Sequence, residues 1–133
     1  MGSMRASAQQ LENLRHDIRV RSHTITSDEP KDHGGDDNGP SPQELLAASL
    51  ASCVAITMEM YAKRKGWEVA GLTVDCEYTP AERGFPTRFD VVMKMPARLT
   101  DEQIERLQVI AAKCPVHRTL EGEVAFDERV ELA

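Results

Sequence analysis

Three cysteines are the residues of this chain with the clearest capacity for chemistry. Cys53, Cys76 and Cys114 make an odd number of thiols in 133 residues, far fewer than a secreted disulfide scaffold carries. This count favours free thiols in a reducing compartment, and we predict a cytoplasmic protein. What each thiol can do depends on the element that carries it.

Cys114 has the local sequence most typical of a reactive thiol. It directly precedes a proline that can begin a helix, so its sulfur would face free backbone N–H groups. Arg118 would add a positive charge if this turn is helical, and both effects lower a thiol pKa. Cys114 could instead form a Cys–His nucleophile or half a zinc site with His117. No second ligand pair lies at finger-like spacing, so we predict no metal.

The other two cysteines are interpreted, from the residues alone, as packing residues. Cys76 is on the inward side of an alternating stretch, between Val74 and Tyr78. Cys53 lies in the apolar segment SLASCVAIT, where apolar surroundings would leave a thiol inert. The chain has no CxxC motif, so a redox pair of Cys53 with Cys114 requires the fold to bring them together.

A long helix is predicted over residues 42–65. Ser41 and Glu44 form a capping box around Pro42, and an apolar run follows them. The basic residues at 63–65 and the glycine after them are typical of a helix end. The helix should therefore begin and end sharply.

After Gln43 and Glu44, the residues of this helix up to Thr57 are apolar or small on every side. Such a helix is expected to be buried all round, and a second copy of the chain is the simplest cover for it. The longest uncharged run, residues 45–58, is shorter than the roughly 20 residues needed to span a bilayer. We therefore predict a homodimer and no membrane partner.

The rest of the chain predicts a single α+β domain over residues 1–133, in which residues 1–4 resemble a cloning remnant. Residues 28–40 are predicted to be a solvated acidic connector. A second helix is expected to begin after the capping box of Thr100 and Gln103, and Pro115 should end it. Strands are expected around residues 18–20 and 24–26, in a hairpin over 72–78 and 89–95, and over 124–132.

The charge balance bears on possible partners. The formal net charge is −6 and only 5% of the residues are aromatic. A nucleic-acid groove requires clustered basic residues interleaved with stacking rings. We therefore predict no nucleic-acid partner.

Three segments, in this order, resemble the osmotically inducible protein C (OsmC) family, which includes the organic hydroperoxide resistance proteins. They are GPSPQELLAASLASC, MYAKRKGW and KCPVHRTLEG, and the resemblance runs from about Ile18 to the C-terminus. The similarity is greatest to a less characterised OsmC-like subgroup. It implies an α+β fold in which the antiparallel sheets of an intertwined homodimer wrap two long central helices, with active sites at the subunit interface.

The resemblance implies a thiol-dependent hydroperoxide reductase and changes the interpretation of Cys53. Cys53 matches the family's peroxidatic cysteine, which attacks the terminal peroxide oxygen and becomes a sulfenic acid. Cys114 matches the resolving cysteine, which forms a disulfide that an external dithiol, lipoyl-linked in characterised members, reduces. The resemblance implies no cofactor.

One position departs from the family pattern. Peroxidase members carry a glutamate directly after the motif proline, paired with an arginine from near the N-terminus that helps to activate the thiolate. Gln43 takes that place here, and the carboxylate of Glu44 lies one position on, about 100° around the helix. A neutral amide cannot form the same ion pair. The candidates for the arginine are Arg5, Arg15, Arg19 and Arg21.

This departure keeps two alternatives open. The first is a thiol redox protein without efficient peroxidase activity. The second is a non-catalytic dimer that binds a small hydrophobic ligand in an apolar cavity and retains its cysteines as packing residues.

Overall fold

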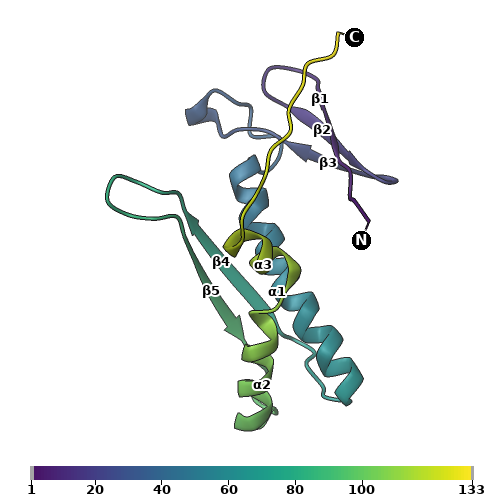
Figure 1. Cartoon of the computed structure of the whole chain (residues 1–133), viewed down its shortest axis with the longest axis vertical. Coiled ribbons are helices and arrows are strands. Elements are labelled where there is room, and N and C mark those ends of the chain that lie inside the picture. The colour runs from purple at the N-terminus through teal and green to yellow at the C-terminus, as the bar shows by residue number, and fades with distance from the viewer. Residues whose placement is uncertain (1, 133) are drawn as a thin grey trace. The chain divides into compact units, whose positions relative to one another are not determined.

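The computed structural model describes residues 2–132, and the chain divides into two compact units, Met1–Ala47 and Ala48–Ala133. Two small antiparallel sheets, one in each unit, combine with helices (Figure 1). This is the α+β class predicted from the sequence. The division falls inside the longest helix, and the single domain expected from the chain length stays a prediction.

The first unit contains a three-stranded antiparallel sheet with strand order β1-β2-β3. Its turns place Asn13 and Arg21 at φ of 49° and 55°, in the left-handed region. The two strands expected around residues 18–20 and 24–26 are confirmed. The strands are β1 (Ser7–Gln10), β2 (His16–Val20) and β3 (His23–Ser27).

The acidic segment after β3, residues 28–40, was predicted to be a solvated connector, but backbone hydrogen bonds to a buried side chain hold part of it in place. The carboxylate of Asp28 is buried and accepts hydrogen bonds from the backbone N–H groups of Glu29 (2.8 Å) and Asn38 (3.0 Å). The bond from Asn38 helps to hold the pKa of Asp28 below its usual value. Gly35 is buried against this turn, where a Cβ would lie only 2.0 Å from the Glu29 carbonyl oxygen. A short 3-10 helix, η1 (Lys31–His33), lies within the segment.

Helix α1 (Pro42–Lys65) has the bounds that its end signals predict. At its start the backbone N–H of Glu44 donates to Ser41 Oγ (3.2 Å), and Glu44 Oε1 accepts from the Ser41 N–H (2.9 Å). At its end Gly66 has φ of 73°, and the N–H of Trp67 donates back to the Ala62 carbonyl (2.9 Å). These bonds satisfy backbone groups that a helix end leaves unpaired.

The second unit builds its core between α1, a hairpin and two shorter helices (Figure 1). One stripe of α1 is buried, and it consists of Leu50, Val54, Met58 and Ala62. The inward side chains of the hairpin pack against this core, and so does the buried face of α2. The elements are β4 (Thr73–Thr79), β5 (Arg88–Lys94), α2 (Asp101–Ala111) and α3 (Pro115–Glu121).

The second unit also bears out the expected hairpin and the expected start of α2. Strands β4 and β5 pair in antiparallel register, with Cys76 opposite Val91. Thr100 and Gln103 form both hydrogen bonds of the predicted capping box (2.9 and 3.1 Å). Cys114 follows α2 in the chain and is the N-cap residue of α3.

Only one stripe of α1 is covered within a single chain, although its composition predicted burial on every side. Ile56 and Met60, away from the stripe, are 50% and 62% exposed. By length and composition α1 could also cross a membrane. Its buried stripe, however, packs into the core of the second unit, as expected for the core helix of a soluble protein.

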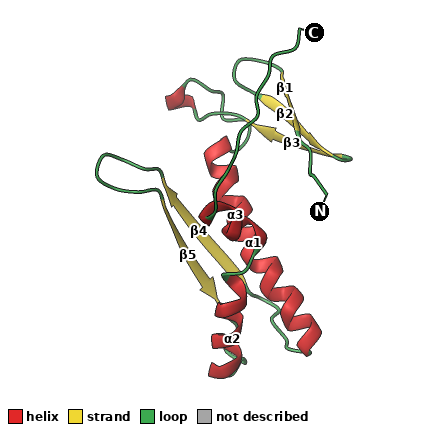
Figure 2. Ribbon diagram, viewed as in Figure 1, coloured by secondary structure: helices red, strands yellow, loops and turns green. Residues whose placement is uncertain are grey.

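The strand expected over residues 124–132 is absent, which corrects the prediction. The chain after α3 has no regular structure up to residue 132 (Figure 2). Its apolar residues are open to solvent, with Phe126 80% and Val130 91% exposed. An alternating pattern forms a strand only where a neighbouring strand supplies hydrogen bonds, and none of the strands described in residues 2–132 pairs with this segment.

Candidate active site

The fold brings together two thiols that are 61 positions apart in the sequence, Cys53 and Cys114. Cys53 is half-buried on α1 and packs against the core cluster that includes Cys114, which is fully buried. Cys53 lies near enough to contribute to the raised pKa of the Cys114 thiol. Both cysteines are free in this structure. The site therefore holds a reduced dithiol.

The environment of Cys114 differs from the one predicted from its motif. Burial is the largest effect and raises the pKa of the Cys114 thiol, and the interaction with Cys53 raises it further. The backbone N–H of His117 donates to Cys114 Sγ (3.3 Å) and acts in the opposite direction without overcoming burial. The predicted N–H donor is present, but the expected lowering of the pKa is wrong because desolvation outweighs it.

The raised pKa of Cys114 predicts a loss of stability at alkaline pH. The folded chain holds this proton more tightly than the unfolded chain does. The resulting contribution to the free energy of unfolding is complete below about pH 8.5 and is lost as the pH rises through the folded-state pKa. Urea unfolding of the reduced protein from about pH 7 to about pH 10 measures this slope. Cys114→Ala should flatten it, and an unchanged slope would contradict the assigned environment.

A mainly apolar pocket of about 300 Å³ is lined by sequence neighbours of the two cysteines, and neither cysteine lines it. Leu50, one helical turn before Cys53, lines it, and so does His117, whose N–H contacts Cys114. Phe89 and Val91 of β5 complete its apolar wall. His117 Nδ1 lies 2.7 Å from Glu121 Oε1 at the edge of the pocket, and the angles of this approach do not make a hydrogen bond. The pocket is large enough for a small apolar group.

Cys76 has the packing role that the alternating pattern predicted. It is half-buried on β4 and contacts the core cluster. Burial raises the pKa of its thiol, and the nearby Asp90 carboxylate raises it further. Both effects favour the protonated, unreactive form.

Two of the predicted supporting residues lie in the first unit, and the third, Arg118, lies in the second unit with the thiols. Gln43 and Glu44 belong to the first unit, and Ser41 holds the Glu44 carboxylate in the capping box and its pKa below the usual value. Arg118 is exposed on α3, and no hydrogen bond or ion pair of its guanidinium appears within residues 2–132. The helical turn between Cys114 and Arg118 does form, but the guanidinium of Arg118 is exposed to solvent.

Among the four candidate arginines, Arg15 is distinguished by its surroundings. Its Nε is buried and has no hydrogen-bond partner in the part of the chain that the structure describes. Arg5, Arg19 and Arg21 show no such buried nitrogen. Sequence reasoning could not separate the four because all precede α1 in a polar region.

Two features of the site were not identified from the sequence, the pocket wall and the His117–Glu121 pair. The apolar wall of the pocket comes from β5, and the His117–Glu121 pair is visible in the sequence only as an i, i+4 spacing. No group of three metal-ligating side chains occurs within residues 2–132.

Comparison with known proteins shows the family and the fold of this chain. The family model for OsmC-like protein matches residues 34–129, which is most of the chain. A proposed osmotic stress induced and detoxification response protein of Psychrobacter arcticus is 25% identical, with a TM-score of 0.76 over 90% of this chain and 89% of that one. No match was found among the curated proteins.

Two further solved structures share the fold at lower identity. An OsmC-like protein of Mycoplasma pneumoniae is 20% identical, with a TM-score of 0.76 over 91% of this chain and 89% of that one. An organic hydroperoxide resistance protein OsmC of Legionella pneumophila is 18% identical, with a TM-score of 0.64 over 92% and 91% of the two chains. By the family match and by its fold, this chain belongs to the OsmC-like protein family.

Proposed function

We propose that this protein reduces organic hydroperoxides through the dithiol of Cys53 and Cys114. The observation that carries the proposal is that these two side chains, which lie on different elements, pack in one core cluster, where Cys53 contributes to the raised pKa of the Cys114 thiol. A disulfide requires such proximity of its two cysteines. Family membership supports the same chemistry, because solved relatives include organic hydroperoxide resistance proteins.

The proposed cycle starts at Cys53. Its thiolate attacks the terminal oxygen of the hydroperoxide, the O–O bond breaks, and the alcohol leaves with one proton. Cys53 is then a sulfenic acid. Cys114 attacks this sulfur, water leaves, and a Cys53–Cys114 disulfide forms. An external dithiol, of the lipoyl type by family resemblance, supplies two electrons and two protons that restore both thiols.

The two cysteines suit different steps of this cycle. Burial raises the pKa of the Cys114 thiol and favours its protonated form, which suits the resolving step and not the first attack. The apolar pocket lined by Leu50 and Phe89 would hold the organic part of the substrate. Gln43 supplies no negative charge, so we propose slower turnover than in members that carry the glutamate.

Counting thiols tests the proposal. The reduced protein, with its three free cysteines, is treated with one equivalent of cumene hydroperoxide and its thiols are titrated. We expect two thiols to disappear and one to remain. Three thiols that still titrate would contradict the proposal and favour the non-catalytic binding role.

We also propose that the working form is a homodimer. Ile56 and Met60 leave an apolar face of α1 exposed, and Phe126 and Val130 do the same for the segment after α3. A second copy would cover both and could supply the strand partner that residues 124–132 lack. Free thiols and the helix packing into a core agree with a soluble cytoplasmic protein.

The dimer is expected to dissociate when the exposed face of α1 becomes charged. Met60→Glu places a carboxylate at the centre of the proposed contact, and an unpaired charge buried there costs several kcal/mol. Size-exclusion chromatography with light scattering should show about twice the 14.8 kDa chain mass for the parent and a single chain for the variant. Lys113→Glu, an equally exposed change on another element, should leave the mass unchanged. A parent mass of one chain would contradict the dimer.

A further inference from the structure

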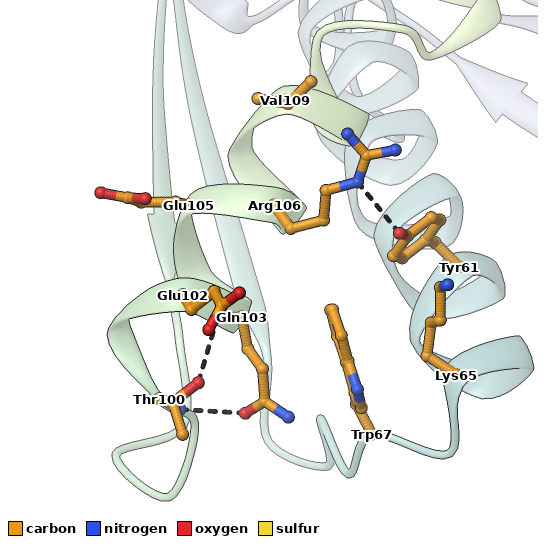
Figure 3. A pocket seen from close by; sticks show the side chains of 9 residues that line it. All are labelled: Tyr61, Lys65, Trp67, Thr100, Glu102, Gln103, Glu105, Arg106 and Val109. Carbon is orange, nitrogen blue, oxygen red and sulfur yellow. Dashed lines mark hydrogen bonds between the residues drawn. The ribbon is translucent and has the colours of Figure 1, made fainter.

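A second pocket, of about 650 Å³, lies between the C-terminal part of α1, Trp67 and α2 (Figure 3). Its walls include Tyr61 and Lys65 on one side and Gln103 and Arg106 on the other. Tyr61 is eight residues beyond Cys53, or about 12 Å along the helix. The thiol chemistry proposed above uses none of these side chains.

The pocket combines two aromatic rings with a fixed guanidinium. The rings of Tyr61 and Trp67 meet edge to face, with centroids 5.6 Å apart. Arg106 Nε donates to Tyr61 Oη (3.0 Å), which links α2 to α1 and leaves the terminal nitrogens of the guanidinium available (Figure 3). The guanidinium is therefore held in place before any ligand arrives.

Positive charge is concentrated beside the Tyr61 ring. The charged groups of Arg64, Lys65 and Arg106 lie 5.7, 5.6 and 5.5 Å from its centroid. The hydrogen bond from Arg106, together with these charges, lowers the pKa of Tyr61. Such a cluster is notable in a chain whose formal net charge is −6.

Lys65 and Arg106 form no ion pair within residues 2–132, although Glu102 and Glu105 line the same pocket. Glu105 also lines the pocket, but its carboxylate points away from Tyr61 and Lys65 (Figure 3). The part of the pocket around Tyr61 is thus rich in hydrogen-bond donors and positive charge. The acidic lining residues, Glu102 and Glu105, come from α2.

We propose that this pocket binds a small monocarboxylate with an aromatic or aliphatic body. A guanidinium matches a carboxylate in shape and charge, and the Lys65 ammonium can approach the same anion. The Trp67 and Tyr61 rings would contact the apolar body of the ligand. The pocket volume lies within the range usual for small-molecule sites. Glu102 and Glu105 disfavour a more highly charged anion such as a phosphate.

The single tryptophan of the chain makes this proposal directly measurable. Trp67 lines the pocket, so its fluorescence reports on occupancy without a label. The reduced full-length protein is titrated with phenylacetate and with octanoate, alongside phenylacetamide and inorganic phosphate. We expect a saturable change with each carboxylate and a much weaker change with the neutral amide and with phosphate.

Variants separate this site from a general attraction of anions. Arg106→Gln should weaken carboxylate binding at least about tenfold, since it removes a charge-assisted hydrogen bond. Arg106→Lys keeps the positive charge and loses the planar guanidinium. Its affinity for the carboxylate should lie between those of the parent and of Arg106→Gln. Lys63→Gln is the matched control, because it removes a charge from the same end of α1 without lining the pocket, and its affinity should be unchanged.

Several results would overturn the proposal. They are a response to phenylacetamide equal to that of phenylacetate, an equal response to phosphate, and no loss of affinity in Arg106→Gln that is folded by circular dichroism. A fluorescence change that follows protein concentration instead of ligand would show that a second copy covers the pocket. The measurement uses no hydroperoxide, so its outcome is independent of the proposed reductase activity.

Discussion

Replacing Cys53 by serine is expected to reduce hydroperoxide turnover by at least about a thousandfold, or roughly 4 kcal/mol of activation free energy. The thiolate is the nucleophile of the proposed first step, and a serine hydroxyl without an adjacent base is not ionised near neutral pH. The measurement is steady-state consumption of cumene hydroperoxide with excess dihydrolipoamide. Serine nearly preserves the volume of this half-buried side chain, so the loss should be chemical.

The other two cysteines supply matched controls for this experiment. Cys76→Ser should retain parent activity, because Cys76 packs on β4 among core residues. Cys114→Ser should still consume one equivalent of hydroperoxide and then accumulate a sulfenic acid, which a dimedone adduct detects by its mass. Turnover in Cys53→Ser above about a tenth of the parent rate would contradict the assignment of the nucleophile.

Leu107→Ala is expected to lower the free energy of unfolding by about 2 to 5 kcal/mol. Leu107 is 0% exposed and belongs to the core cluster that contains Cys114. The substitution removes buried apolar surface and leaves a cavity that the surrounding helices can close only in part. It also loosens α2, which leads directly into Cys114, so disulfide formation should slow as well.

The control lies two residues further along the same helix. Val109 is 49% exposed, and Val109→Ala should change the free energy of unfolding by less than about 1 kcal/mol. Urea unfolding followed by far-ultraviolet circular dichroism measures both variants. A loss below about 1 kcal/mol in Leu107→Ala would contradict the placement of this residue at the centre of the second unit.

The bounds of the helices were predictable because their end signals are local. Ser41 with Glu44 and Thr100 with Gln103 form hydrogen bonds between residues three positions apart. Gly66 takes the left-handed conformation that ends α1. The hairpin of β4 and β5 followed from alternation for the same reason, since its two strands are close in the sequence.

The features that were missed or wrong depend on groups that are distant in the sequence. The local motif of Cys114 predicts a lowered pKa, but burial by α1 and α2 raises it. The expected last strand is absent because alternation around Phe126 and Val130 does not supply a neighbour to pair with. The approach of Cys53 to Cys114 also depends on packing, and family resemblance was the only sequence signal for it.

Peptide mapping after a single oxidation tests the central claim most directly. Reduced protein is treated with one equivalent of cumene hydroperoxide, the remaining thiols are alkylated, and the digest is analysed by mass spectrometry without reduction. The account predicts a linked pair of peptides that carry Cys53 and Cys114, and an alkylated Cys76. A disulfide that includes Cys76, or alkylation of all three cysteines, would contradict it.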